Sequence, residues 1–219
     1  MTDELVVVGD IHGDIARLDR MLALISEIDR KIVFLGDYVN RGDQSFAVVE
    51  RLLCARRAAP MKFTFLMGNH ELALVKFLEG EDFVSFASIG GIPTIRSYVG
   101  SNIYGGVREA LSQHMPEQHR EFLDTLDLYW ESDDVLISHI GYDPQTPRDR
   151  SVASMVSDAH PEIFSDPNPP VALTVCGHYV QPCGRPYISK HLLCIDTGCG
   201  TRNGPLTAVL LPERQFISV

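Results

Sequence analysis

Six side chains of the kinds that bind metal ions stand at or just beyond the ends of short apolar runs. They are Asp10 and His12 in GDIHG, Asp37 in GDYVNRG, Asn69 in GNHE, His139 in SHIG and His178 in CGH. Imidazole and carboxylate ligands together suit Mn, Fe or Zn, and one carboxylate can bridge two ions roughly 3.5–4 Å apart in a hydrolytic site. Asp37, the carboxylate of the middle loop, is the natural bridge. The residue types therefore predict a two-metal hydrolytic centre.

Each of these residues has an ordinary structural explanation when it is taken alone. An Asp after a strand often caps a helix, an Asn in a turn often serves its backbone, and a lone His is usually structural. Glycine precedes Asp10, Asp37, Asn69 and His178, and glycine at a strand exit allows tight turns that aim a neighbouring side chain. Because the motifs occur in order at strand-to-helix junctions, the metal-site interpretation is favoured over separate coincidences.

The elements that would position these residues form three successive β-loop-α units. Strands and helices are predicted in alternation over residues 5–8, 14–25, 32–35, 45–58, 63–67 and from 71 onward. Such units build a parallel sheet, and ligands bind outside the carboxyl ends of its strands, where the three loops lie. Further short strands are predicted over 135–138, 171–176, 192–195, 206–211 and 216–219. We expect the strand-end loops to converge on one site.

Two segments depart from this alternation. Residues 79–131 contain Gly-rich and helical pieces, which indicate a cap or insertion about 79–131 inside a single domain over 1–219. Residues 143–170 hold six prolines and predict a long, irregular connection, of the kind that usually lies near a site. A chain of 219 residues and 24.4 kDa can bury its core within one such domain.

Composition restricts the class of protein. The apolar fraction of 45% and the charged fraction of 22% are ordinary for a soluble chain, and no run approaches the ~18 apolar residues of a membrane span. The N-terminus lacks the features of a signal peptide, so a cytoplasmic protein is expected. A net charge of −10 without a Lys/Arg cluster argues against nucleic acid as a partner. Five scattered cysteines predict reduced thiols, mostly buried.

The motifs GDIHG, GDYVNRG and GNHE, followed by two later histidines, resemble the phosphoprotein phosphatase branch of the calcineurin-like metallophosphoesterases. That branch has the pattern GDxHG, GDxVDRG and GNHE, and the resemblance covers essentially the whole chain. Residues 90–98 and 195–199 also resemble its small bacterial serine/threonine phosphatases. The resemblance implies an α/β (α+β) fold in which a β-sandwich is flanked by helices in four αββα layers.

The resemblance also implies a role for each site residue. The ligands implied for the first ion are Asp10, His12 and Asp37, and those for the second are Asp37, Asn69, His139 and His178. A hydroxide bridging the ions would then attack phosphorus directly, without a covalent intermediate. Arg41 matches the family's phosphate clamp, and His70 matches the general acid that protonates the leaving group. Glu71 could orient a ligand or cap the following helix.

The chain departs from the family pattern at two places. Asn40 stands where the family has an acid that pairs with the GNHE histidine, so we expect slower general-acid catalysis or a lower pH optimum, with Asp43 as a weak substitute. The family's second phosphate-binding Arg is also missing from the corresponding stretch, residues 155–160. Arg148 and Arg150 lie on the Pro-rich connection, where solvated charges are the favoured interpretation.

These observations lead to one favoured function and two alternatives. The favoured function is a phosphomonoesterase resembling serine/threonine protein phosphatases, which acts on a phosphorylated protein or small phosphoester. One alternative is a polyphosphate hydrolase resembling diadenosine tetraphosphatases, and the other is a degenerate module that only binds phosphorylated partners. Manganese is the favoured metal, with Fe, Zn or Ni possible for such ligands, and the sequence does not indicate an oligomeric state.

Three further residues of reactive or titratable type carry no predicted chemistry. Cys199 lacks any visible His-Cys-acid arrangement, so we expect a buried, unreactive thiol. His114 and His119 lie on the polar cap, where a solvated imidazole is the ordinary expectation.

Overall fold

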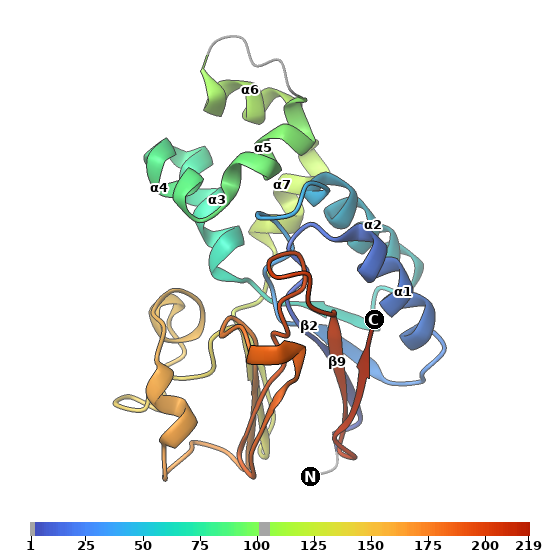
Figure 1. The fold of residues 1–219 in the computed structure, drawn as a ribbon, viewed down its shortest axis with the longest axis vertical. Coiled ribbons are helices and arrows are strands. Elements are labelled where there is room, and N and C mark those ends of the chain that lie inside the picture. The colour runs from blue at the N-terminus through green and yellow to red at the C-terminus, as the bar shows by residue number, and fades with distance from the viewer. Residues whose placement is uncertain (1–2, 101–105) are drawn as a thin grey trace.

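Two five-stranded sheets pack against each other in the computed structural model, which describes residues 3–100 and 106–219 (Figure 1). Residues 101–105 of the predicted cap lie outside the described residues. The first sheet has the order β10-β9-β1-β2-β3, and the second has the order β4-β5-β6-β8-β7. The predicted α/β sandwich flanked by helices is confirmed.

Each sheet contains a parallel unit of three strands. In the first sheet these are β1 (Leu5–Val8), β2 (Lys31–Phe34) and β3 (Phe63–Phe65), joined on one side by antiparallel β9 (Thr207–Leu211) and β10 (Gln215–Ser218). In the second they are β5 (Val135–Ser138), β6 (Leu173–Cys176) and β8 (Leu192–Cys194), edged by antiparallel β4 (Tyr129–Glu131) and β7 (Tyr187–Ile188). The chain therefore presents six parallel strand ends to possible ligands.

Strand residues alternate between two apolar layers, as the two-residue period of a strand requires. Val7 and Val33 face the second sheet, where they meet Ile137 and Val175 in a core between the sheets. Their neighbours on β1 and β2 face the opposite way and pack under helices. This double-sided burial explains why these strands read as continuous β-branched runs.

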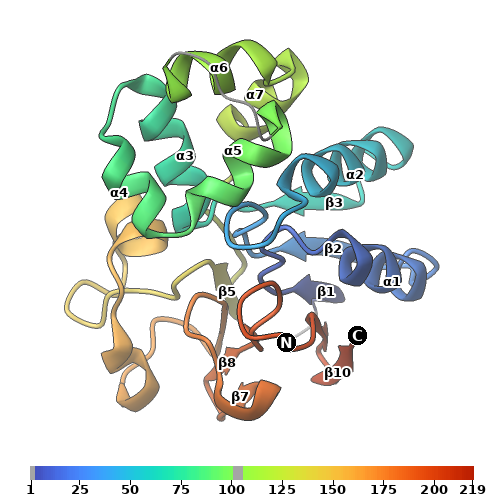
Figure 2. The same cartoon turned by 45° about the horizontal axis from the view of Figure 1, so that its top comes forward.

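Helices cover the outer face of the first sheet and one end of the sandwich. α1 (Ile15–Ile25) and α2 (Ser45–Ala58) lie on the outer face (Figure 1). Grouped over the end are α3 (Asn69–Glu79), α4 (Phe83–Ser88), α5 (Gly91–Val99), α6 (Val107–His114) and α7 (Glu117–Asp124) (Figure 2). The fold thus places α5, from the predicted cap, in contact with α2.

The Pro-rich connection covers the outer face of the second sheet with short helical turns. These are η1 (Ala153–Ser157) and η2 (Pro161–Ser165), whose apolar side chains pack on β5, β6 and β8, and a further turn, η3 (Pro182–Gly184), follows β6. Within the ranges that the structure describes, no helix combines the length and hydropathy needed to cross a membrane.

The expectation that His119 is solvated is wrong. Its side chain is fully buried, and its ring nitrogens lie 2.9 Å from the Tyr98 hydroxyl and 3.1 Å from a Glu50 carboxylate oxygen. These partners come from α5 and α2, so the polar side chain joins three helices across a contact that local sequence does not reveal. His114 is exposed, as expected.

Candidate metal centre

The six predicted ligands come together where the parallel strands of both sheets end. Asp10, His12, Asp37 and His139 are each at most 2% exposed, whereas Asn69 and His178 are half-buried. Each follows its strand by a few residues, so the fold alone brings side chains from positions 10 to 178 to one place.

Asp37 lies at the middle of the cluster, with one carboxylate oxygen toward each sheet. Its Oδ2 is 3.4 Å from His12 Nε2, while its Oδ1 is 3.4 Å from His139 Nε2. Two groups of side chains that could each hold a cation share this carboxylate, one with His12 and His70 and the other with Asp10 and His139. The geometry is that of a carboxylate placed between two cation positions.

The half-buried ligands complete the side of the cluster near the second sheet. Asn69 Oδ1 lies 3.0 Å from His139 Nε2 and 2.9 Å from His178 Nδ1. The other ring nitrogen of His139 faces the Leu35 carbonyl at 3.1 Å, which orients the imidazole. An amide oxygen and two imidazole nitrogens therefore point at one position, as ligands of a single ion would.

Two buried carboxylate oxygens have no hydrogen-bond partner among the residues that the structure describes. One is Asp10 Oδ1, whose companion Oδ2 accepts the His178 amide at 3.0 Å, and the other is Asp196 Oδ2. A buried carboxylate oxygen without a donor costs free energy unless a cation binds it. The donor set and these unpartnered atoms fit divalent metal ions.

Burial and neighbouring charge set the protonation of the cluster. Burial lowers the pKa of His12 and of His178 to about 4, so both imidazoles are neutral near pH 7, as metal ligands must be. Burial opposes the ionisation of Asp37, but His139 and His70 outweigh it and hold its pKa well below the usual range. Burial, and then the charges of Asp196 and Asp37, raise the pKa of Asp10.

Glu71 organises the central loop. Its carboxylate accepts backbone N–H groups from Asp37 at 2.7 Å, Tyr38 at 2.8 Å and Val39 at 3.0 Å, and from Gly68 at 3.1 Å at the start of α3. Both roles left open by the sequence are thus present, because the same side chain caps α3 and shapes the loop that carries Asp37.

Asn40, Arg41 and His70 lie together at the cap side of the cluster. Asn40 Nδ2 lies 2.9 Å from His70 Nδ1, and Arg41 Nη2 lies 3.3 Å from His70 Nε2. Asn40 and His70 are buried, whereas Arg41 is exposed. Burial lowers the pKa of His70 to about 4. Asp43 is exposed, and Asn40 itself occupies the position beside the imidazole.

The other candidates lie away from the cluster. Arg150 forms an ion pair with Glu131 at 2.6 Å, and Arg148 is exposed. The Cys199 thiol is buried and donates to the Ile11 carbonyl at 3.3 Å, and burial raises its pKa, which makes it unreactive as expected. Of the remaining cysteines, Cys176 and Cys194 are also buried.

Asp196 was not predicted as a site residue. It follows β8 directly and is 1% exposed, and its Oδ1 accepts the Gly198 amide at 3.0 Å. Burial raises its pKa to about 6. The sequence signal was its position at the end of a parallel strand, which is the same signal that marked the predicted ligands.

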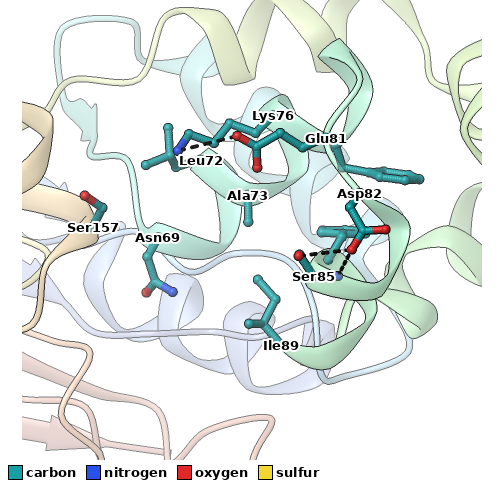
Figure 3. Close-up of a pocket in the computed structure, with 11 residues that line it drawn as sticks. Asn69, Leu72, Ala73, Lys76, Glu81, Asp82, Ser85, Ile89 and Ser157 are labelled. Atoms are coloured by element: carbon teal, nitrogen blue, oxygen red, sulfur yellow. Dashed lines mark hydrogen bonds and ion pairs between the residues drawn. The ribbon is translucent and has the colours of Figure 1, made fainter.

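A cavity of about 270 Å³ adjoins the cluster at Asn69, between α3, α4 and η1 (Figure 3). Apolar side chains including Leu72, Ala73 and Ile89 line much of it. Its charged residues are Lys76, Glu81 and Asp82, and Lys76 Nζ lies 3.8 Å from a Glu81 carboxylate oxygen. The cavity can receive the part of a substrate that extends beyond a phosphoryl group, and its charge is net negative.

Comparison with known proteins agrees with this geometry. Residues 4–182 match the model of the calcineurin-like phosphoesterase family. The chain belongs to the calcineurin-like phosphoesterase family. It is accordingly a metal-dependent phosphoesterase, and the predicted family and enzyme class are confirmed.

Relatives within the family have different activities. The chain is 24% identical to the bis(5'-nucleosyl)-tetraphosphatase PrpE [asymmetrical] of Oceanobacillus iheyensis, over 97% of this chain and 90% of PrpE. It is 37% identical to a protein phosphatase 2A catalytic polypeptide of Dictyostelium discoideum, but that match covers only 31% of this chain and 22% of the phosphatase.

A solved structure shares the fold at low identity. The serine/threonine phosphatase of Saccharomyces cerevisiae with similarity to human PP5 superposes with a TM-score of 0.62 at 16% identity, over 99% of this chain and 79% of that one. This likeness concerns the fold alone, so the substrate must be argued from the site.

Proposed function

We propose that the chain is a two-metal phosphomonoesterase that hydrolyses phosphoserine or phosphothreonine in proteins. The observation that carries the proposal is the position of Asp37, whose two carboxylate oxygens each lie 3.4 Å from an imidazole of a different sheet. A carboxylate shared in this way is suited to hold two ions at once, as direct hydrolysis of a phosphoester needs.

The proposed ligand sets follow the two halves of the cluster. The first ion would be held by Asp10, His12 and Asp37, and the second by Asp37, Asn69, His139 and His178. When bound, the two ions would neutralise phosphoryl oxygens and lower the pKa of a water molecule. Manganese remains the favoured metal, because its ligand preferences match mixed carboxylate and imidazole donors.

The chain's own groups would act on the two ends of the phosphoryl transfer. Arg41 is exposed beside the cluster, where its planar guanidinium can hold two phosphoryl oxygens. His70 lies against both Arg41 and Asp37, so its Nε2 can direct a proton toward the leaving oxygen. The missing second arginine would weaken substrate binding without removing this machinery.

A polyphosphate hydrolase is the second candidate, favoured by the similarity to PrpE over nearly the whole chain. The charges beside the centre argue against it. The adjoining cavity carries two carboxylates for one lysine, and that lysine is already ion-paired. A dinucleoside polyphosphate brings several negative charges and would meet repulsion there, whereas a peptide would not. The binding-only alternative is disfavoured because the structure brings all six ligands together.

The test is hydrolysis by chelator-stripped protein before and after addition of Mn²⁺. The substrates are p-nitrophenyl phosphate, a phosphothreonine peptide and diadenosine tetraphosphate, with Asp37→Asn as the inactive control. Metal-dependent turnover with a higher kcat/KM for the peptide than for the dinucleotide supports the proposal. A preference for the dinucleotide establishes the second candidate, and bound metal without turnover of any substrate establishes the binding-only one.

A further inference from the structure

A threonine of the cap is hydrogen-bonded to the catalytic centre. Thr94 of α5 is fully buried, and its hydroxyl donates to Asn40 Oδ1 at 2.8 Å. The same hydroxyl accepts the Asn40 backbone N–H at 2.8 Å and lies 2.9 Å from the Ser45 hydroxyl. Both the backbone and the side chain of Asn40 are therefore held by one residue that lies 54 positions away in the sequence.

This contact decides which end of the Asn40 amide faces His70. Because Oδ1 is bound by Thr94, the amide presents Nδ2 to His70 Nδ1 at 2.9 Å. An amide nitrogen can only donate, so His70 Nδ1 must accept and carries no proton. The proton of the neutral imidazole is then on Nε2, which lies 3.8 Å from Asp37 Oδ2 and so faces the metal cluster.

We propose that Thr94 is a positioning residue of the catalytic centre, which acts through Asn40 to hold His70 as the tautomer with its proton on Nε2. The catalytic consequence rests on the proposed function. In this tautomer His70 donates a hydrogen bond from Nε2 to the leaving-group oxygen. Nε2 then offers Arg41 no lone pair, so the guanidinium N–H groups are available to phosphoryl oxygens.

The identity of residue 40 determines the tautomer. A carboxylate at this position can only accept, so Asn40→Asp would require a proton on Nδ1 and would leave Nε2 without one in the neutral ring. The departure of this chain from the family pattern therefore changes the location of a proton as well as a charge. Thr94 is what makes the amide act in one orientation only.

The tautomer can be measured without any turnover. The probe is the zinc-loaded full chain labelled with ¹⁵N-histidine, in which the ring-nitrogen shifts of His70 are assigned by their loss in His70→Gln. We expect a protonated Nε2 in the wild type and in Thr94→Ser, which keeps the hydroxyl. We expect a protonated Nδ1 in Asn40→Asp and a mixture in Thr94→Val. A protonated Nδ1 in the wild type, or an unchanged tautomer in Thr94→Val, overturns the proposal.

Kinetics provide the second readout. Loss of an orienting partner typically costs 10–100-fold, so Thr94→Val should lower kcat about tenfold with KM for p-nitrophenyl phosphate unchanged, and Thr94→Ser should restore it. Thr174→Val is the matched control, because Thr174 is also fully buried and its hydroxyl has no partner among the described residues. Equal effects of both valine substitutions would reduce Thr94 to a structural role. The expected tautomers in a chain without turnover would overturn the proposed function while leaving the positioning role intact.

Discussion

Gly68 gives the sharpest test that the Asp37 carboxylate must stay where the structure places it. Gly68 is the N-cap of α3 with φ −93° and ψ 167°, a conformation that alanine adopts without strain. A Cβ added there would lie 2.2 Å from Asp37 Oδ1 and 2.3 Å from the Asp37 backbone nitrogen. The substitution Gly68→Ala therefore acts through space alone.

The expected size of the effect follows from these distances. Ordinary van der Waals contact of a Cβ begins at 3.4 Å, so Asp37 or α3 must move by about 1 Å. Overpacking of this kind costs about 1–3 kcal/mol of stability. A displacement of about 1 Å at a reacting centre can cost on the order of 100-fold in rate, so we expect a loss of that order in kcat/KM and weaker Mn²⁺ binding.

The assays are urea unfolding, calorimetric titration with Mn²⁺ and hydrolysis of p-nitrophenyl phosphate. Gly106→Ala is the matched control, because Gly106 is the N-cap of α6 in a similar conformation, φ −73° and ψ 130°. Its added Cβ would meet only the end of the Glu109 side chain, which can rotate away. Unchanged metal affinity and turnover in Gly68→Ala would refute the reasoning, since Asp37 would then not need its observed position.

Three further predictions concern charge. Asp37→Asn should abolish both metal binding and turnover, and full activity with normal metal content would refute the bridging assignment. Asp196→Asn should reduce the rise in Tm that Mn²⁺ causes, because it removes a buried charge that acts on Asp10; an unchanged rise would show that Asp196 does not contribute to cation binding. Hydrogen bonding from Arg30 lowers the pKa of Glu213 from 4.5 to about 2, so the stability it contributes is present above pH 4.5 and is lost as pH falls toward 2. The Tm difference between wild type and Glu213→Gln should accordingly narrow over that range, and a constant difference would contradict this.

Local patterns were sufficient for the sheets and for the ligand-bearing loops. The run at 5–8 and the helical spacing after it predicted β1 and α1, and the predicted helix over 45–58 matches α2. Chain order within βα units fixes that strands run parallel, so the meeting of the first three loops followed from sequence alone. The helix predicted from 71 begins at Asn69, because glycine at position 68 serves as its N-cap.

Contacts between distant segments were not visible in the sequence. Thr94 is an unremarkable residue of an amphipathic helix, and only the packing of α5 against the Asn40 loop gives its hydroxyl a partner. His119 was expected in solvent for the same reason, since its partners lie on two other helices. Asp196 differs, because its place after a strand was visible but no metal motif surrounded it.

Backbone strain at the centre has a physical consequence for ion binding. His12, Asp37, Asn40, Arg41 and His178 all have positive φ, between 47° and 66°, and such conformations cost non-glycine residues about 1–3 kcal/mol each where the surroundings enforce them. The Glu71 carboxylate, which binds three consecutive amides of the central loop, provides part of that enforcement. Because the strain is already accepted when the chain folds, the ligands need little rearrangement to receive a cation. Relief of the unpartnered carboxylate oxygens then favours binding directly.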